Sequence, residues 1–455
     1  MINRAILLFL LLQVIISPQP FGTGALIERE LYANSPLQAP LMRGSYKDLP
    51  KAVSLKQYSP VPGNQGRSGT CAGWATAYAC RTMLDGIKYG WDKSNSTDNA
   101  YSPSFVYNLI RAQDNCEGGA SIVDALNVLK DQGGVKINSF AYDCDRKVEM
   151  TDLDSASRHK IVEYRLVASY ENKNQTMFVK KSLAERKPVV LVMDIPESFF
   201  EAGEFWVPDS SEYETWGNGH AMGIVGYDDS KNGGSFEIIN SWGTSWGKDG
   251  YTWMRYSDFD FFCLYAFELI DVSIKDPNRP DLSGTILFRE SNGKEMKADF
   301  NGSYFFMEKA YPSGTLFELF VSNNEPAYLY VFSSDLTGKI TKVFPYNDRM
   351  VAYLPYSQND IAIPDEESYN MLDETEGKTY FCFLYSKARL DIDKVLSDIE
   401  KLKGGFYEKV RNVLRDEIID FGTIEFNYEK KISFSSKGSM NKLIPIIIEI
   451  EHKNK

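Results

Sequence analysis

Three residues of the kinds that perform nucleophilic catalysis lie far apart in this sequence, each beside a distinctive segment. Cys71 follows a glycine-rich loop and opens an apolar stretch with helical spacing. His220 opens one strand-like apolar stretch, and Asn240 ends another. A cysteine, a histidine and an asparagine can act as nucleophile, base and orienting group once a fold brings them together. Gln65, six residues before Cys71, is suited to donate its side-chain amide to an oxyanion beside the sulfur.

The stretch after the loop predicts a helix from Cys71 to Ile87. Ser68 or Thr70 can cap this helix, which leaves Cys71 in its first turn. Unpaired backbone N–H groups and the helix dipole favour a thiolate there, so the sequence predicts an activated cysteine. The alternative is that Cys71 is a small buried hydrophobic residue, as most isolated helical cysteines are. That alternative does not explain Gln65 or the two later segments.

The spacing Gln65-x5-Cys71 and the segments GNGHAMGIVGYDD and IINSWGTSWGKDGY together resemble the motifs of papain-family cysteine peptidases. The resemblance covers about residues 46–270. It implies an α+β fold of two lobes, with Cys71 on a helical lobe and His220 and Asn240 on a β-barrel lobe. It further implies peptide hydrolysis through an acyl-enzyme thioester: His220 takes the proton of Cys71, Asn240 holds the ring, and Gln65 stabilises the oxyanion.

The resemblance also marks substrate-binding positions. Gly118 and Gly119 match the strip along which an extended substrate backbone pairs, although a Gly-Gly pair by itself is equally typical of a turn. Trp242 matches the residue that covers the histidine–asparagine hydrogen bond. Gly219 and the small residues after the glycine pair imply a wide main specificity pocket. We therefore expect bulky apolar side chains to be accepted at the second position before the cut.

The six cysteines are Cys71, Cys80, Cys116, Cys144, Cys263 and Cys382. With Cys71 as nucleophile, five remain, so at least one more thiol stays free or pairs outside the chain. Cys116 matches a family position whose usual partner is replaced here by Ser68. A bond between Cys116 and Cys144 is a possible substitute, which the sequence leaves open.

The N-terminal residues 1–24 predict a signal peptide, because one early charge precedes an apolar run that ends at prolines, with cleavage near residues 22–25. The apolar core of about twelve residues is shorter than the roughly 20 that span a bilayer, so a permanent anchor is the less favoured alternative. We therefore expect a protein that is secreted, periplasmic or on the cell surface. The short extension at 25–45 makes control by a large prodomain unexpected.

At 455 residues the chain exceeds what one core usually supports, and two folded domains are expected. We predict the papain-like domain at 46–272, a linker at 273–282 and a β-rich α+β accessory domain at 283–455. Part of the latter resembles an uncharacterised bacterial domain often attached to peptidases, which transfers no function. Its alternating Tyr328, Tyr330 and Phe332 form either a ligand-facing stripe or, more typically, a core face.

Charge and histidine content exclude several functions. Fifty basic against 62 acidic residues give a net charge of −12 without a basic block, which disfavours nucleic-acid binding. Besides His220 the chain has only His159 and His452, expected on the surface and in a charged tail, so neither a metal nor a cofactor is expected. The leading hypothesis is a secreted cysteine endopeptidase acting on protein or peptide substrates. The alternatives are acyl transfer or deamidation by the same residues, and a catalytically silent binding protein. The partner of the accessory domain is unknown.

Overall fold

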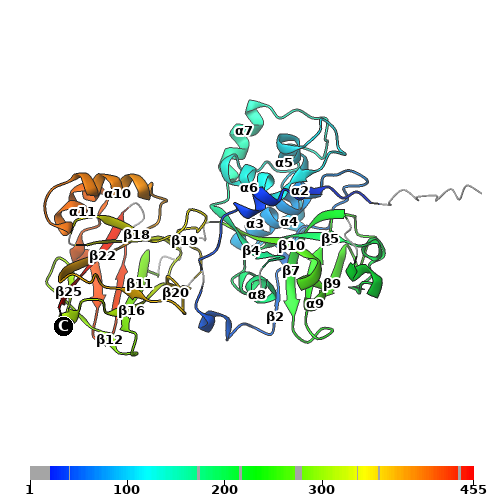
Figure 1. Ribbon diagram of the computed structural model, residues 1–455. Coiled ribbons are helices and arrows are strands. Elements are labelled where there is room, and N and C mark those ends of the chain that lie inside the picture. The colour runs from blue at the N-terminus through cyan, green and yellow to red at the C-terminus, as the bar shows by residue number, and fades with distance from the viewer. Residues whose placement is uncertain are drawn as a thin grey trace, which may run out of the picture.

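The computed structural model describes residues 21–454 except 40, 172–174, 215–217, 272–278, 336, 357–358 and 439–441. Figure 1 shows two bodies, one with helices packed on a sheet and one built mainly of strands, with α10 and α11 along its edge. The predicted signal peptide at 1–24 and linker at 273–282 lie largely outside the described residues. The domain boundaries given above remain predictions.

The helical part of the first body surrounds the segment that begins at Cys71. Three consecutive elements form it: α2 (Cys71–Gly73), the π-helix η3 (Trp74–Arg81) and α3 (Thr82–Tyr89). Gly90, with a φ of 68°, ends the segment in the left-handed conformation that glycine adopts without strain. The predicted helix is confirmed, whereas its π-helical middle was not expected. Around it lie α4 (Lys93–Asp98), α5 (Pro103–Ile110), α6 (Ile122–Asp131) and α7 (Met150–Ala156).

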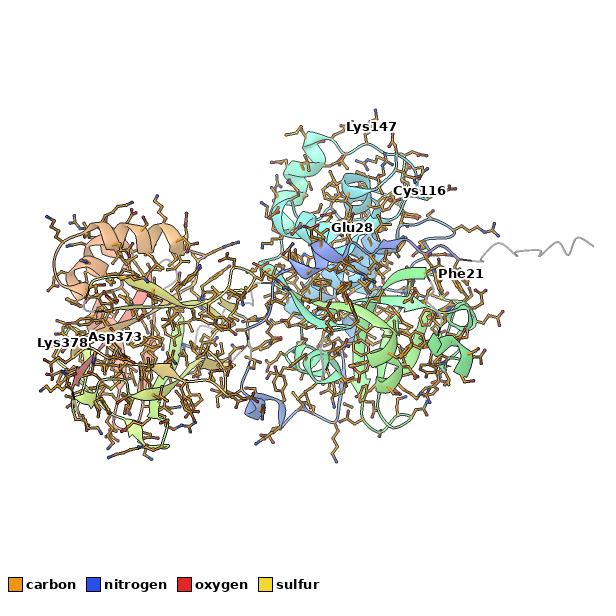
Figure 2. The ribbon with its side chains drawn as sticks, in the orientation of Figure 1. Phe21, Glu28, Cys116, Lys147, Asp373 and Lys378 are labelled. Carbon is orange, nitrogen blue, oxygen red and sulfur yellow. A yellow bond between two sulfur atoms is a disulfide. The ribbon has the colours of Figure 1, made fainter. Side chains whose placement is uncertain are left out.

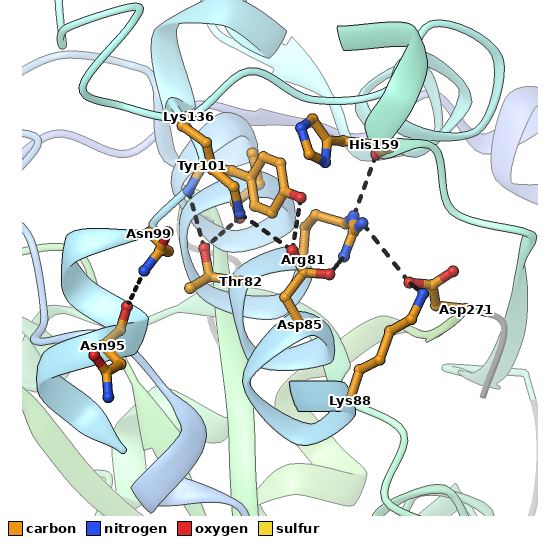
Figure 3. A network of polar contacts seen from close by, with 11 residues as sticks. Arg81, Thr82, Asp85, Lys88, Asn95, Asn99, Tyr101, Lys136, His159 and Asp271 are labelled. Carbon is orange, nitrogen blue, oxygen red and sulfur yellow. Dashed lines mark hydrogen bonds and ion pairs between the residues drawn. The ribbon is translucent and has the colours of Figure 1, made fainter. Parts of the chain in front are cut away.

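A buried polar network fixes the far end of this central segment (Figure 3). Asp85 accepts from Arg81 at 2.6 Å, from the hydroxyl of Tyr101 at 2.7 Å and from Lys136 at 3.1 Å. Burial alone would raise the pKa of Asp85, but Arg81 and Lys136 hold it below its usual range. Arg81 also lies 3.7 Å from Asp271, which follows the last strand of the sheet. The network therefore joins the helical part to the sheet.

The sheet of the first body has the order β4-β10-β5-β7-β8-β9-β6. Six of its strands lie where the sequence pattern predicts strands: β4 (Glu163–Ser169), β5 (Val189–Ile195), β7 (Asn218–Asp228), β8 (Ser235–Ile239), β9 (Tyr251–Arg255) and β10 (Cys263–Ile270). Two short strands were not predicted: β6 (Phe205–Trp206), and β2 (Ala52–Ser54), which pairs with β7. The helices α8 (Gln175–Ala184) and α9 (Tyr256–Phe262) pack against it. Among the described residues β4 and β6 are the ends of an open sheet, so the predicted two-lobed α+β fold is confirmed with an open sheet in place of a closed barrel.

The second body contains two sheets that enclose a large apolar core. The first sheet consists of β11 (Leu282–Glu290), β12 (Glu295–Met296), β16 (Leu316–Asn323), β20 (Asn359–Ile363), β21 (Asn370–Met371), β23 (Ile424–Asn427) and β24 (Ile432–Ser436). The second consists of β13 (Ala298–Phe300), β14 (Phe305–Met307), β15 (Tyr311–Pro312), β17 (Ala327–Ser334), β18 (Ile340–Phe344), β19 (Tyr353–Leu354), β22 (Gly377–Ser386) and β25 (Leu443–Lys453). The expected β-rich accessory fold is confirmed.

Two helices, α10 (Ile392–Lys401) and α11 (Phe406–Leu414), cover the outer face of the second sheet. Tyr328, Tyr330 and Phe332 are buried in the cluster beneath these helices, so the core interpretation of that stripe holds. The charged tail that contains His452 is part of a strand, which the sequence analysis did not anticipate for this residue. His452 lies on β25, fully buried between the hydroxyls of Ser313 and Thr379, because the strand carries the charged tail into the sheet.

Buried polar contacts join the two bodies. Arg165 of β4 and Glu268 of β10 form an ion pair with almost no exposed surface, at 2.7 Å from Nε to Oε1. Tyr356 of the second body donates its hydroxyl to the other oxygen of Glu268 at 2.5 Å. Removing one partner of such a buried set leaves a charge unpaired, which typically costs about 3–5 kcal/mol. The accessory domain is thus fixed against the edge of the first sheet.

The structure contains the disulfide that the sequence analysis offered as a possible substitute for the usual family disulfide. Cys116 and Cys144 form a disulfide with a Cα–Cα distance of 5.5 Å, while the other four cysteines are free and buried. No helix in the described parts of the chain combines the length and the apolar character needed to cross a bilayer.

Candidate active site

Cys71 lies at the start of α2, as predicted, but without the predicted side-chain cap. Thr70 occupies the N-cap position, and its hydroxyl contacts the hydroxyl of Tyr142 at 2.9 Å instead of a backbone N–H. Cys71 itself has no exposed surface. The nucleophile predicted from the sequence is therefore at a helix N-terminus and, in this structure, sealed from solvent.

His220 and Asn240 meet because their strands are neighbours. His220 is near the start of β7, and Asn240 directly follows β8, which pairs antiparallel with β7. Nε2 of His220 lies 2.8 Å from Oδ1 of Asn240, and the same oxygen accepts the N–H of Ser241 at 2.7 Å. The atom of Asn240 that faces the imidazole is thus its oxygen, which can only accept, so Nε2 of His220 donates to it. In the neutral ring Nδ1 then carries no proton and can accept one.

Trp242 covers this hydrogen bond, as the resemblance implied. Its ring lies 4.6 Å from that of His220, at an angle of 22°, and both side chains are fully buried. The aromatic face excludes water from the polar contact, which strengthens it and holds the imidazole in one orientation.

Gln65 is held by a neighbour that the sequence did not single out. Its Oε1 accepts the hydroxyl of Ser241 at 2.6 Å, so its Nε2 points the other way. That Nε2 donates to the carbonyl of Ser68 at 2.6 Å and to the carbonyl of Gly22 at 3.0 Å. Ser241 follows Asn240 directly, so one short segment positions both predicted polar groups.

The carbonyl of Gly22, which accepts from Gln65, belongs to a segment that the sequence analysis assigned to the predicted signal peptide and the short extension after it. Residues 21–26, here called the cleft segment, run between the helical part and the sheet (Figure 1, N-terminal blue chain; Figure 2, from Phe21 towards Glu28). Phe21 stacks on Trp242 at 4.9 Å, and the carbonyl of Gly22 also accepts Nε1 of Trp242 at 3.0 Å. The cleft segment thus covers Trp242 and reaches Gln65.

The second half of the cleft segment follows the predicted substrate strip. The N–H of Gly24 donates to Gly219 at 3.2 Å, and its carbonyl accepts the N–H of Ala120 at 2.9 Å. β1 (Ala25–Leu26) then pairs parallel with β3 (Ala120–Ser121). Side chains on the glycines would not fit, because a methyl group on Gly219 would lie 2.3 Å from the carbonyl of Ala25, and one on Gly119 2.6 Å from that of Gly24.

Of the four predicted substrate-binding residues, three therefore contact the cleft segment: Gly119, Gly219 and Trp242. Gly118 does not, since its α-carbon faces Gln113. Of the four predicted catalytic residues, Gln65 contacts the carbonyl of Gly22 directly, and His220 stacks on Trp242, which donates to the same carbonyl. The cleft segment was not predicted as part of the site, although glycines at alternate positions, 22 and 24, are typical of extended backbone lying close to another chain.

Burial shifts the pKa of both reactive groups in this arrangement. It raises the pKa of the Cys71 thiol to about 12, against the weaker effect of nearby backbone N–H groups such as that of Ala221. Burial also lowers the pKa of His220 to about 4, although its bond to Asn240 opposes this shift. In this structure burial therefore opposes the thiolate expected at Cys71, which stays a prediction for an open cleft.

Groups suited to hold a metal are not found here. Among the described residues, no cluster of three or more histidine, cysteine, aspartate or glutamate side chains is arranged to bind an ion.

Comparison with known proteins agrees with this geometry. Residues 54–263 match the sequence model of the papain family cysteine proteases, and residues 310–389 match a domain of unknown function, DUF4384. The chain therefore carries a papain-family cysteine protease domain followed by a DUF4384 domain.

Individual relatives are distant. The cysteine endopeptidase Rep1 of Oryza sativa subsp. japonica is 27% identical over 263 residues, which cover 56% of this chain and 66% of Rep1. Cathepsin L of Sarcophaga peregrina is 26% identical over 45% of this chain and 58% of its own length. The match thus spans less than two thirds of each of these two relatives. Xylellain, a cysteine protease from Xylella fastidiosa, superposes with a TM-score of 0.46 and 23% identity over 56% of this chain and 97% of Xylellain.

Proposed function

We propose that this chain is an exported cysteine peptidase that hydrolyses peptide bonds with Cys71 as nucleophile, His220 as base and Asn240 as the group that orients His220. The observation that carries the proposal is the carbonyl of Gly22 held 3.0 Å from Nε2 of Gln65. A peptide carbonyl of the chain itself thus lies at the donor expected to stabilise an oxyanion. The name of the relative Rep1, a cysteine endopeptidase, agrees with this chemistry.

The proposed reaction begins when the cleft is open. Nδ1 of His220 takes the proton of Cys71, and the thiolate attacks the substrate carbonyl to give a tetrahedral oxyanion. Gln65 and the backbone N–H of Cys71 stabilise that oxyanion, each such donor typically lowering the barrier by about 3 kcal/mol. His220 then protonates the leaving amine, and water hydrolyses the acyl-enzyme thioester. Asn240 keeps the ring oriented throughout.

In the uncleaved chain this enzyme is latent. The cleft segment fills the space that a substrate needs, and the neutral thiol and imidazole described above are both unsuited to attack. The predicted signal peptide remains part of the proposal, together with a secreted, periplasmic or cell-surface location.

The test is alkylation and hydrolysis by the exported, processed protein. Iodoacetamide at about pH 6 reacts poorly with an ordinary thiol of pKa about 8.5 but quickly with a thiolate paired with imidazolium. We expect mass mapping to show rapid labelling of Cys71 that is lost in His220→Ala and retained in the matched control His159→Ala. Hydrolysis of fluorogenic peptides that persists in Cys71→Ala would contradict the proposal. So would amine incorporation in place of hydrolysis.

A further inference from the structure

The cleft segment and the chain that follows it differ in how firmly they are attached. Up to Gly24, the described contacts are one ring stack, between Phe21 and Trp242, and hydrogen bonds that involve main-chain groups of the segment. After Gly24 the chain is anchored by buried side chains and by both domains. This difference decides which residues can occupy the cleft once the N-terminus has been removed.

Tyr32 is the main anchor of the later part. It lies in α1 (Arg29–Ala33), is fully buried, and stacks on Tyr265 at 4.0 Å. Its hydroxyl reaches back to the carbonyl of Leu26 at 3.2 Å, so it fixes β1 directly. Burial of this large aromatic side chain stabilises the position of β1 on the strip through contacts that do not involve residues 21–24.

The accessory domain supplies a second anchor. Leu37 exchanges two backbone hydrogen bonds with residues 349–351 of the second body, at 2.8 and 3.0 Å. On its other side the carbonyl of Pro36 accepts the N–H of Leu166, on the edge strand β4, at 2.8 Å. Arg349 donates to the carbonyl of Ser35 at 3.3 Å. Residues 35–37 are thus held between the two domains.

Processing at the start of β1 is chemically suited to this sequence. Gly22-Thr23-Gly24 has the small-x-small pattern that precedes a signal-peptide cut. Hydrolysis of the Gly24–Ala25 bond takes up one water and leaves a carboxylate on Gly24 and an ammonium group on Ala25. The cut occurs during export, before the cleft folds around the bond, so its burial in the uncleaved chain is no obstacle.

We propose that processing removes residues up to Gly24 only, and that β1 stays on the strip as a wall of the open cleft, so that the mature enzyme is an exopeptidase acting on free N-termini. This inference rests on the proposed function and names its substrate class. Loss of residues 21–24 frees the donors and acceptors that a substrate needs, among them Nε2 of Gln65, the N–H of Ala120 and the carbonyl of Gly219. The rest of the strip remains covered.

The number of substrate residues that fit before the scissile bond follows from where the residues of the cleft segment lie. The carbonyl of Gly22 marks the place of the reacting carbonyl, and only residues 23 and 24 separate it from β1. By the family resemblance, residues before the scissile bond lie along this strip. A substrate therefore has room for at most two residues there. The enzyme would release one or two residues from an unblocked N-terminus, and a longer or blocked chain would collide with Ala25 and Leu26.

The test uses the full gene exported from a bacterial host. Mass spectrometry of the purified protein is expected to find Ala25 as the N-terminal residue; retention of Phe21 would overturn the proposal. Aminoacyl and dipeptidyl aminomethylcoumarin amides with free amines are expected to have kcat/KM at least about tenfold above that of N-acetylated tetrapeptide amides. Equal values would overturn it.

A variant of Tyr32 tests whether β1 blocks longer substrates, and its effect differs from that of a general loss of structure. Tyr32→Ala, which releases the anchor of β1, is expected to raise kcat/KM for the N-acetylated tetrapeptide at least about tenfold. The matched control Tyr89→Ala, at an exposed tyrosine, is expected to leave it unchanged. A misfolded protein gains no activity, so an unchanged or lower value for Tyr32→Ala in a folded protein argues against the wall.

Alkylation distinguishes failure of this inference from failure of the proposed function. In the processed wild type, Cys71 is expected to react quickly with iodoacetamide and slowly with an N-acetylated tripeptidyl chloromethyl ketone. Fast reaction with both reagents would overturn the wall even if no peptide is hydrolysed. Slow reaction with iodoacetamide would instead overturn the proposed nucleophile.

Discussion

Expelling the cleft segment from the uncleaved chain should activate Cys71. Gly22→Val is the perturbation of choice, because a Cβ at this position would lie 2.2 Å from the carbonyl oxygen of Ser68 and 2.5 Å from the carbonyl carbon of Arg67. Both obstacles are backbone, which cannot rotate away as a side chain would. The matched control is Gly44→Val, which also precedes the predicted papain-like domain and where a Cβ would meet nothing within 4 Å.

The expected change in the alkylation rate follows from the pKa of the Cys71 thiol. Burial raises the pKa of Cys71 from an ordinary value near 9 to about 12. A difference of three units lowers the thiolate fraction at neutral pH by about 1,000-fold, and the alkylation rate falls with it. Expulsion of the segment should recover most of this factor. In the wild type the rate should keep rising about tenfold per pH unit through pH 10, whereas in Gly22→Val it should level off at a lower pH.

The assay is the second-order rate constant for iodoacetamide at Cys71, followed by mass mapping of the uncleaved proteins from pH 6 to pH 10. Circular dichroism checks that the variants are folded. Equal rate constants for Gly22→Val and Gly44→Val in folded proteins would refute the argument that the segment, rather than the fold of the lobes, keeps the thiol neutral.

Three further predictions concern single contacts. Adding His220→Ala to the Gly22→Val variant should lower the rate of Cys71 alkylation at pH 6 at least about tenfold, because no imidazolium then stabilises the thiolate. An unchanged rate would exclude a thiolate–imidazolium pair of Cys71 and His220. Tyr356→Phe should lower the free energy of unfolding by about 2 kcal/mol in urea melts, because it removes a hydrogen bond to the buried carboxylate of Glu268, while Phe at the exposed Tyr369 should cost nothing measurable. Cys116→Ser should cost about 3.5 kcal/mol, the chain-entropy value for a cross-link between residues 28 apart, and reduction of the wild type should have the same effect.

Much of the site could be predicted because its signals are local. Asn232 with the two glycines after it predicts a turn between two apolar strands, and that turn sets the pairing of β7 with β8. With this register, a histidine at the start of one strand and an asparagine at the end of the other must be neighbours. Their 2.8 Å contact follows from a pattern of about 20 residues.

The burial of His452 and the role of Ser241 could not be predicted in the same way. Each depends on segments that are distant in the sequence. Ser241 is followed by Trp242 in an obvious motif, yet its bond to Gln65 joins residues 176 positions apart. A serine has no pattern of its own that would indicate such a partner.

The sequence by itself determined the candidate nucleophile, base and orienting residue, the order of the two domains and most of the strands, because these depend on spacing and on turns. Only the tertiary structure decided the state of the site. Residues 21–26 pack between Trp242 and the strip at Ala120, and burial raises the pKa of Cys71 and lowers that of His220. Solvation of a charge depends on every atom around it, which no local pattern specifies.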